Sequence, residues 1–299
     1  MKARRAFILL TLTVLVLTVI AGCGATPTPT PKPLPPTPTP TVAPFPMTVT
    51  DADNRSVTVK ATPKRIVSLL PSATEVLFAI GAGEQVVGVT TFCNYPPEAA
   101  NREKIGGYSA KTISIEKIVA LKPDLVVAES GTHSSVTQAL EPLGIAVFVI
   151  KPTSFTDVYS TITTLGKLTG HASKAATVVA DMQKRIKAIT DKVATIPQDK
   201  KLTVFWEIWD EPLMTAGPNT FPGQIIGMAG GINIFADVTK DWPQVSAEEV
   251  VKRNPAVIVG PDTHGDKLTS EQIAKRPGWA SIKAVSTGRI HLINGDTSS

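Results

Sequence analysis

Two glutamates occupy equivalent places in a segment that the chain uses twice. Residues 114–130 read SIEKIVALKPDLVVAES, and residues 246–262 read SAEEVVKRNPAVIVGPD. In each copy a glutamate, Glu116 or Glu248, stands two residues after a serine that can cap a helix. A carboxylate in the first turn of a helix is favoured by the helix dipole alone, so either residue by itself is unremarkable. Their repetition is the feature that a functional role has to explain.

A histidine follows each copy of this segment. The first copy continues into ESGTH and the second into PDTH, which places His133 and His264 in similar loops. One interpretation is a pair of nitrogen ligands for a metal. The other is two loop histidines in water, which the sequence favours because no carboxylate or cysteine spacing supports a metal site. The sequence contains no Gly-x-Ser-x-Gly, phosphate loop, HExxH or CxxC motif, and we therefore expect no enzyme.

The elements that position these residues alternate between strands and helices, which predicts parallel sheets in an α/β fold. Ser72 with Glu75, and Ser246 with Glu249, predict capping boxes. Residues 172–195 contain no glycine or proline and predict one long rigid α-helix between two Rossmann-like lobes. Apolar runs predict strands at 65–70, 86–90, 125–128, 146–150, 203–209, 256–260 and 289–293, after a β-hairpin over 47–60.

A small-molecule site is expected between the two lobes. Ligands of open α/β sheets bind beyond the carboxyl ends of the strands, and domain interfaces are common places for such sites. The expected lining is aromatic and apolar with a few polar groups, which suits a large, partly flat ligand. The residues expected there are Phe92, Tyr95, Tyr108, Glu129, His133, Met214, Trp242 and His264.

The N-terminus predicts export and a lipid anchor. Residues 1–22 combine a basic start, an apolar run too short for a stable transmembrane helix and small residues at the end, as in a signal peptide. Cys23 stands where a bacterial lipobox has its lipidated cysteine. Residues 23–46 are rich in Thr-Pro and predict an extended tether. The body is expected to divide into an N-terminal lobe, a helical segment and a C-terminal lobe, over 47–153, 154–196 and 197–299.

Charge and cysteine content narrow the partners further. The net charge of +5 arises mostly before residue 47, and the remainder holds 26 basic and 25 acidic residues, so nucleic-acid binding is not expected. With Cys23 lipidated, Cys93 has no disulfide partner, and we expect it to be a small buried residue.

The segments KRIVSLLPSATEVLFAIGAGEQVVGVT, NYPPEA, IEKIVALKPDLVVA and WPQVSAEEVVKRNPAVIV resemble the helical-backbone (class III) periplasmic-binding-protein-like receptors of ABC importers, and most closely the vitamin B12 (cobalamin) binding proteins. This resemblance implies a monomeric receptor outside the cytoplasm that delivers a corrinoid to a permease dimer. It implies that Glu116 and Glu248 pair with arginines on the two permease subunits. It also implies ligand contacts by Phe92, Tyr108, Trp242 and Asp296.

Two departures from the family pattern leave the ligand open. Glu129 and Met214 stand where the cobalamin binders tend to have aromatic residues. The sequence ends at Ser299, where the family usually continues into a final helix, so we expect the C-terminal lobe to be truncated. Haem or a ferric siderophore is the alternative ligand, and an extracytoplasmic enzyme on the same scaffold is the least favoured interpretation.

Overall fold

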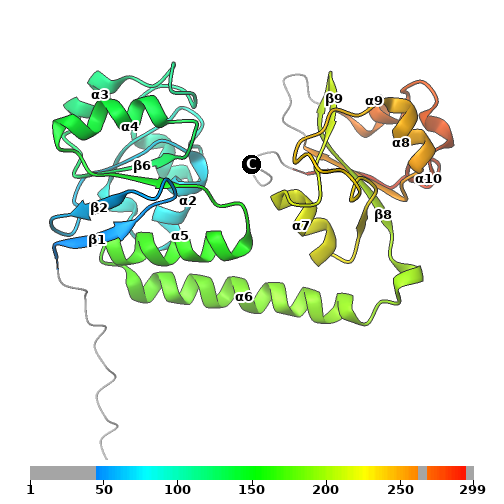
Figure 1. Cartoon of the computed structure of the whole chain (residues 1–299), viewed down its shortest axis with the longest axis horizontal. Helices are drawn as coiled ribbons and strands as arrows, with labels where there is room; N and C mark the ends of the chain where they lie inside the picture. The colour runs from blue at the N-terminus through cyan, green and yellow to red at the C-terminus, as the bar shows by residue number, and fades with distance from the viewer. Residues whose placement is uncertain (1–44, 262–267, 294–299) are drawn as a thin grey trace, which may run out of the picture. The chain divides into compact units, whose positions relative to one another are not determined.

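The computed structural model describes residues 45–261 and 268–293, which form two β-sheets, a separate hairpin and the helices around them (Figure 1). The predicted signal peptide, Cys23 and nearly all of the tether lie outside the described residues. The described elements follow the α/β alternation that the sequence predicts.

The first sheet is parallel throughout and has the order β5-β4-β3-β6-β7. The chain builds outward from β3 to β5 and then returns to the other side for β6 and β7. The order therefore reverses between β3 and β6, the type of position where open α/β sheets bind ligands. The strands are β3 (Ile66–Ser68), β4 (Val86–Val89), β5 (Glu103–Lys104), β6 (Leu125–Glu129) and β7 (Val147–Ile150).

Both faces of the first sheet are buried. Alternate residues of β6 enter different apolar clusters, with Leu125 and Val127 in one and Val126 and Ala128 in the other. This two-sided burial explains why the strand is a continuous apolar run in the sequence. The helices of this lobe are α2 (Pro71–Ala79), α3 (Ile115–Ala120) and α4 (Ser134–Leu140), with short 3₁₀ turns at Gly83–Gln85, Pro97–Asn101 and Glu141–Leu143.

A hairpin of β1 (Met47–Thr50) and β2 (Ser56–Val59) precedes the first sheet, and its turn covers the edge strand β7. Ala52 N–H donates to the Val149 carbonyl at 3.0 Å, and Val149 N–H donates to the Asp51 carboxylate at 3.3 Å. The same carboxylate accepts from the N–H groups of Asp53 and Arg55 and from the Arg55 side chain. An edge strand that would otherwise expose its backbone is thereby paired.

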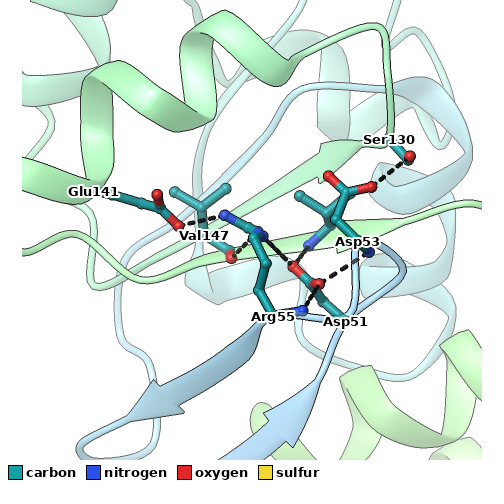
Figure 2. Close-up of polar contacts among 7 residues, drawn as sticks. Asp51, Asp53, Arg55, Ser130, Glu141 and Val147 are labelled. Carbon is teal, nitrogen blue, oxygen red and sulfur yellow. Dashed lines mark hydrogen bonds and ion pairs between the residues drawn. The ribbon is translucent and has the colours of Figure 1, made fainter.

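Arg55 and Asp53 extend this turn to two further segments of the first lobe (Figure 2). The Arg55 guanidinium donates to the Val147 carbonyl at 3.0 Å and pairs with Glu141, which lies just after α4. Ser130, in the loop before α4, donates its hydroxyl to the Asp53 carboxylate at 2.6 Å. The hairpin turn therefore holds the chain on both sides of α4.

Two helices, α5 (Phe155–Leu168) and α6 (Ala172–Ala194), connect the sheets and pack side by side (Figure 1). The 23 residues of α6 give it a length of about 34 Å, which confirms the predicted long helix. Its first half packs Val178, Val179 and Met182 against the first lobe. Its second half lines an apolar pocket with residues of α5 and α7, including Phe155, Ile186, Ile189, Ile225 and Met228.

The second sheet repeats the plan of the first with one antiparallel addition. Its parallel strands have the order β10-β8-β11-β12, which again reverses beside the first strand. β9 folds back antiparallel on β8, at residues for which the sequence predicts no strand. The strands are β8 (Thr203–Asp210), β9 (Leu213–Thr215), β10 (Ile232–Asn233), β11 (Val257–Pro261) and β12 (Ile290–Ile293). The helices are α7 (Phe221–Met228), α8 (Ala247–Arg253), α9 (Ser270–Ala274) and α10 (Lys283–Ser286), with 3₁₀ turns at Gln198–Lys200 and Trp279–Ser281.

The capping predictions are partly confirmed. Ser246 accepts from Glu249 N–H, but the Glu249 carboxylate bonds Arg253 and does not close a box. The prediction at Ser72 is wrong, because the N-cap residue is Leu70, two residues earlier; the helix begins at Pro71 and has no side-chain cap. Proline suits the first helical position, where no N–H is needed, and this moves Ser72 inside the helix. A complete capping box, which is not among the predicted ones, lies at the start of α9.

Candidate functional site

Exposed aromatic side chains gather at one edge of each sheet. Among the described residues, the five Phe, Tyr and Trp side chains with more than a third of their surface exposed all lie at or after the carboxyl end of a strand. The first lobe contributes Phe92, with 58% of its surface exposed, Tyr95 and Tyr108; the second contributes Trp209 and Trp242, the latter 48% exposed. Open α/β sheets bind their ligands at these edges, so the exposed aromatic groups make each edge a candidate binding surface.

Tyr108, Glu129 and His133 form a closed ring of hydrogen bonds in the first lobe, which we call the Tyr-Glu-His ring. The Tyr108 hydroxyl donates to the Glu129 carboxylate. Glu129 N–H donates to His133 Nδ1 at 2.9 Å. His133 Nε2 lies 2.8 Å from the Tyr108 carbonyl oxygen. Since Nδ1 accepts a hydrogen bond, Nε2 carries the proton of the neutral imidazole and donates to that carbonyl.

The ring fixes the phenol of Tyr108 and the carboxylate of Glu129 at the end of β6. Burial raises the pKa of Tyr108 well above its usual value, and the hydrogen bond to Glu129 raises this pKa further. The phenol therefore remains a hydrogen-bond donor throughout the physiological range. The rings of Tyr108 and His133 also pack edge to face, with centroids 5.6 Å apart.

Both sequence interpretations of His133 are corrected by these contacts. The side chain is 0% exposed, so it is not a loop histidine in water. Each of its ring nitrogens is engaged with a backbone group, so in this structure neither is available to a metal or a ligand. His133 instead connects the Tyr108 loop to the end of β6. The sequence could not show this, because the Tyr108 carbonyl comes from another element.

Backbone pairing fixes the segment that carries Trp242 in the second lobe. Thr215 N–H donates to the Pro243 carbonyl at 3.1 Å, and Gly217 N–H donates to the Asp241 carbonyl at 2.7 Å, on either side of Trp242. A Cβ at residue 217 would lie 2.3 Å from the Lys240 carbonyl oxygen, so this approach requires glycine. The segment that carries Trp242 is thus held along β9.

Met214 and Trp209 belong to the same part of the second lobe. Met214 lies in β9, half-buried, and pairs with Trp209 across the hairpin and with Gln244 through an isolated bridge. The sequence predicts Met214 in the site but not Trp209. Its position at the carboxyl end of the predicted strand was the signal that could have identified it.

Glu116 and Glu248 have matching local environments. Both lie exposed at the second position of a helix, α3 or α8, whose serine cap accepts an N–H at 3.2 Å or 3.1 Å. Hydrogen bonding to its own backbone N–H, and then to the cap hydroxyl of Ser114 or Ser246, holds the pKa of each glutamate below its usual value. The two carboxylates are therefore equivalent in exposure, position and charge.

Comparison with known proteins identifies the family. A family model described as periplasmic binding protein matches residues 66–297. The chain belongs to this family. An ABC transporter substrate-binding lipoprotein of Bacillus subtilis, YvrC, whose name calls it uncharacterized, is 38% identical over 82% of this chain and 77% of its own length. A cobalamin-binding protein of Halobacterium salinarum is 35% identical over 82% of this chain and 67% of its own length.

Solved structures support the same assignment. A protein of Staphylococcus epidermidis, described as a possible iron-binding periplasmic solute-binding protein, aligns with a TM-score of 0.69 and 31% identity over 79% of this chain and 92% of that chain. The vitamin B12 binding protein BtuF of Vibrio cholerae aligns with a TM-score of 0.65 and 28% identity over 79% and 89%. The predicted class III binding-protein fold is confirmed, and the chain is a substrate-binding protein of an ABC transporter.

Family membership settles the class of ligand and partner but not their identity. Substrate-binding proteins of this family work outside the cytoplasm, carry a small molecule and meet a permease. Within residues 45–261 and 268–293 no helix is long and apolar enough to cross a membrane. In the same ranges no group of three or more His, Cys, Asp or Glu side chains could hold a metal ion. The predicted sites at Cys23, His264 and Asp296 lie outside the described residues.

Cys93 is a small buried residue, as predicted. Its side chain is almost fully buried, and its sulfur lies 3.2 Å from the hydroxyl groups of both Thr74 and Thr90. Cys93 lies between the exposed residues Phe92 and Tyr95 in the chain, so its burial holds the loop that carries both aromatic side chains against the core.

Proposed function

We propose that this protein binds cobalamin or a related corrinoid and delivers it to an ABC importer. The observation that supports this ligand is the set of five exposed aromatic residues at the carboxyl edges of the two sheets. A corrinoid is large and partly flat, and it exposes an apolar ring that aromatic side chains can cover. The name of the Halobacterium relative, at 35% identity, agrees with this choice.

The charge at the edge of the second lobe favours a corrinoid over haem. Asp210, Glu211 and Asp241 stand there against Lys240, whereas the edge of the first lobe carries Glu129 with Lys104 and Lys151. Haem carries propionate groups that need cationic or donor partners, whereas the periphery of cobalamin carries neutral amides. The acidic edge of the second lobe is better matched to amides.

Delivery is proposed to use Glu116 and Glu248. An arginine and a carboxylate form a short, bidentate, charge-assisted pair, and one such pair on each lobe would fix the orientation of the protein on a permease dimer. The exposed, equivalent positions of the two glutamates support this role. Cys23 is proposed to carry the lipid that keeps the monomeric protein at the membrane outside the cytoplasm.

Isothermal titration of the purified full chain in detergent tests the ligand. Cyanocobalamin, dicyanocobinamide, haem and a ferric hydroxamate siderophore are titrated in turn at equal protein concentration. We expect saturable binding of both corrinoids, no turnover of either, and weaker or undetectable binding of haem and the siderophore. Binding of haem or the siderophore alone would reassign the ligand, and binding of none of the four would contradict the proposal.

A further inference from the structure

We infer that the Tyr-Glu-His ring makes Glu129 a specificity residue that selects ligands with neutral hydrogen-bond donors and rejects ligands with carboxylates at this position. This inference rests on the proposed function, because it names the chemistry by which the first lobe would choose among tetrapyrroles. Its starting point is the position of Glu129, which is the last residue of β6 and lies beside the reversal of strand order.

The geometry determines what this carboxylate can do. One of its oxygens accepts from the Tyr108 hydroxyl, and a carboxylate has further lone pairs with which to accept from a ligand. It can therefore bind an amide NH₂, whereas a ligand carboxylate would face a like charge. A like charge placed in a binding site costs affinity, which is how specificity arises against the wrong ligand.

The ring supplies the rigidity that this selection needs. His133 is buried and connects the backbone of Tyr108 to the backbone of Glu129. The next residue, Ser130, donates to Asp53 in the hairpin turn, which fixes the loop from the other side (Figure 2). The Glu129 side chain thus has fixed backbone on both sides and a fixed partner at its tip. A preorganised group of this kind discriminates more strongly than a mobile one.

A matched pair of ligands tests the inference. Dicyanocobinamide carries peripheral amides, and dicyanocobyrinic acid has the same ring system with free carboxylates. We expect the wild-type full chain to prefer cobinamide by at least about tenfold in Kd, and Glu129→Gln to reduce this preference by about fivefold or more, because the like charge is gone. Tyr108→Phe keeps the charge but opens the ring, so its preference should fall between the two.

Glu84→Gln is the control. This variant makes the same change of charge at an exposed residue just before β4, at the amino ends of the strands of the same sheet. It should keep the full preference for cobinamide. Thermal unfolding of each variant checks that the fold is retained. If Glu129→Gln keeps the wild-type preference, the inference is wrong while corrinoid binding stands. If the wild type binds haem but neither corrinoid, or binds no tetrapyrrole at all, the proposed function fails and the inference falls with it.

Discussion

The two lobes hold their exposed aromatic residues in different ways. In the first lobe side-chain hydrogen bonds do so, through the Tyr-Glu-His ring and the hairpin turn that reaches Ser130. In the second lobe backbone pairing does so, because the segment that carries Trp242 bonds along β9. The capped helices that carry Glu116 and Glu248, in contrast, are nearly the same in both.

The capped glutamates and the aromatic edges therefore differ in how closely the two lobes match. The capped glutamates are equivalent, as expected for residues that meet the two related subunits of a permease dimer. The edges that carry the exposed aromatic residues are unlike each other, as expected if each contacts a different side of one asymmetric molecule. Similarity between the lobes therefore points to the proposed docking role, and divergence points to the proposed ligand.

The lobes also bury their charges differently. The first lobe buries Asp51, which is 6% exposed and accepts from three backbone N–H groups and Arg55. The second buries Glu207 in its central strand, 1% exposed, with two hydrogen bonds of 2.7 Å to the Arg276 guanidinium. Arg276 in turn stacks 4.7 Å from the ring centroid of Trp279. A guanidinium thus satisfies the buried carboxylate of the second lobe, where backbone N–H groups contribute in the first.

The largest expected effect follows from reversing both exposed carboxylates. Glu116→Arg with Glu248→Arg should abolish cobalamin uptake by whole cells and leave the Kd for cobalamin unchanged, because each arginine of the permease would then face a like charge. Each single reversal should reduce uptake by a similar amount if the lobes dock equivalently. Glu84→Arg and Glu271→Arg, at exposed positions on the two lobes, are the controls. Normal uptake by the double variant would remove the docking proposal.

The next effect is on stability and concerns the second lobe. Glu207→Ala should lower the free energy of unfolding by about 3–5 kcal/mol, since it leaves the guanidinium of Arg276 without its buried partner. Urea denaturation monitored by circular dichroism measures the change. The exposed pair of Glu271 and Lys275 provides the contrast, and Glu271→Ala should change stability by less than about 0.5 kcal/mol. Equal losses for the two variants would show that the buried pair does not stabilise the lobe.

Substitutions of the exposed aromatic residues should have smaller effects, and these effects on ligand affinity should differ between the two lobes. Trp242→Ala should weaken cobalamin binding by about 2 kcal/mol, or roughly 30-fold in Kd, as expected for an aromatic residue that a ligand buries. Phe92→Ala on the first lobe, where Tyr95 and Tyr108 remain, should have a smaller effect. Titration calorimetry gives both values. Unchanged affinity in the Trp242 variant would exclude the second lobe from the site.

The caps should give equal and modest losses. Ser114→Ala and Ser246→Ala each remove the oxygen that accepts an N–H at the start of α3 or α8, which costs about 1 kcal/mol. Thermal unfolding compares the two variants with wild type. A large difference between them would show that the two helices are less equivalent than their geometry indicates.

The smallest effect concerns the titration of the docking carboxylates. Because the pKa of Glu116 and of Glu248 is lowered in the folded state, their hydrogen bonds stabilise the protein above the usual pKa of glutamate, and this contribution is lost as pH falls through the lowered pKa. Removing a cap hydroxyl should raise the pKa of the neighbouring glutamate. NMR titration of the side-chain carboxyl carbons in wild type and the two serine variants measures this, and an unchanged titration would exclude the hydroxyl as a cause.

The longer elements were predictable from the sequence because each carries its own local signal. The run at 125–129 is apolar because both faces of β6 are buried, and 172–194 lacks any helix breaker. The short strands β5, β9 and β10 were missed, since two or three residues carry no period and become strands only by pairing with a neighbour. The predicted cap at Ser72 is wrong because Pro71 is already the first helical residue and Leu70 the N-cap residue.

The sequence by itself determined the α/β plan, the long helix, the two capped glutamates and the positions of most exposed aromatics, because these depend on local pattern and on the rule that ligands meet the carboxyl ends of strands. Only the tertiary structure decided what His133 does. Its ring nitrogens are satisfied by the amide of Glu129 and by the carbonyl of Tyr108, which lies 25 residues earlier in the chain. A hydrogen bond between distant segments leaves no periodic trace in the sequence, so the sequence could offer His133 only as a loop residue or a metal ligand. The structure shows it as the buried support of the edge that carries Tyr108 and Glu129.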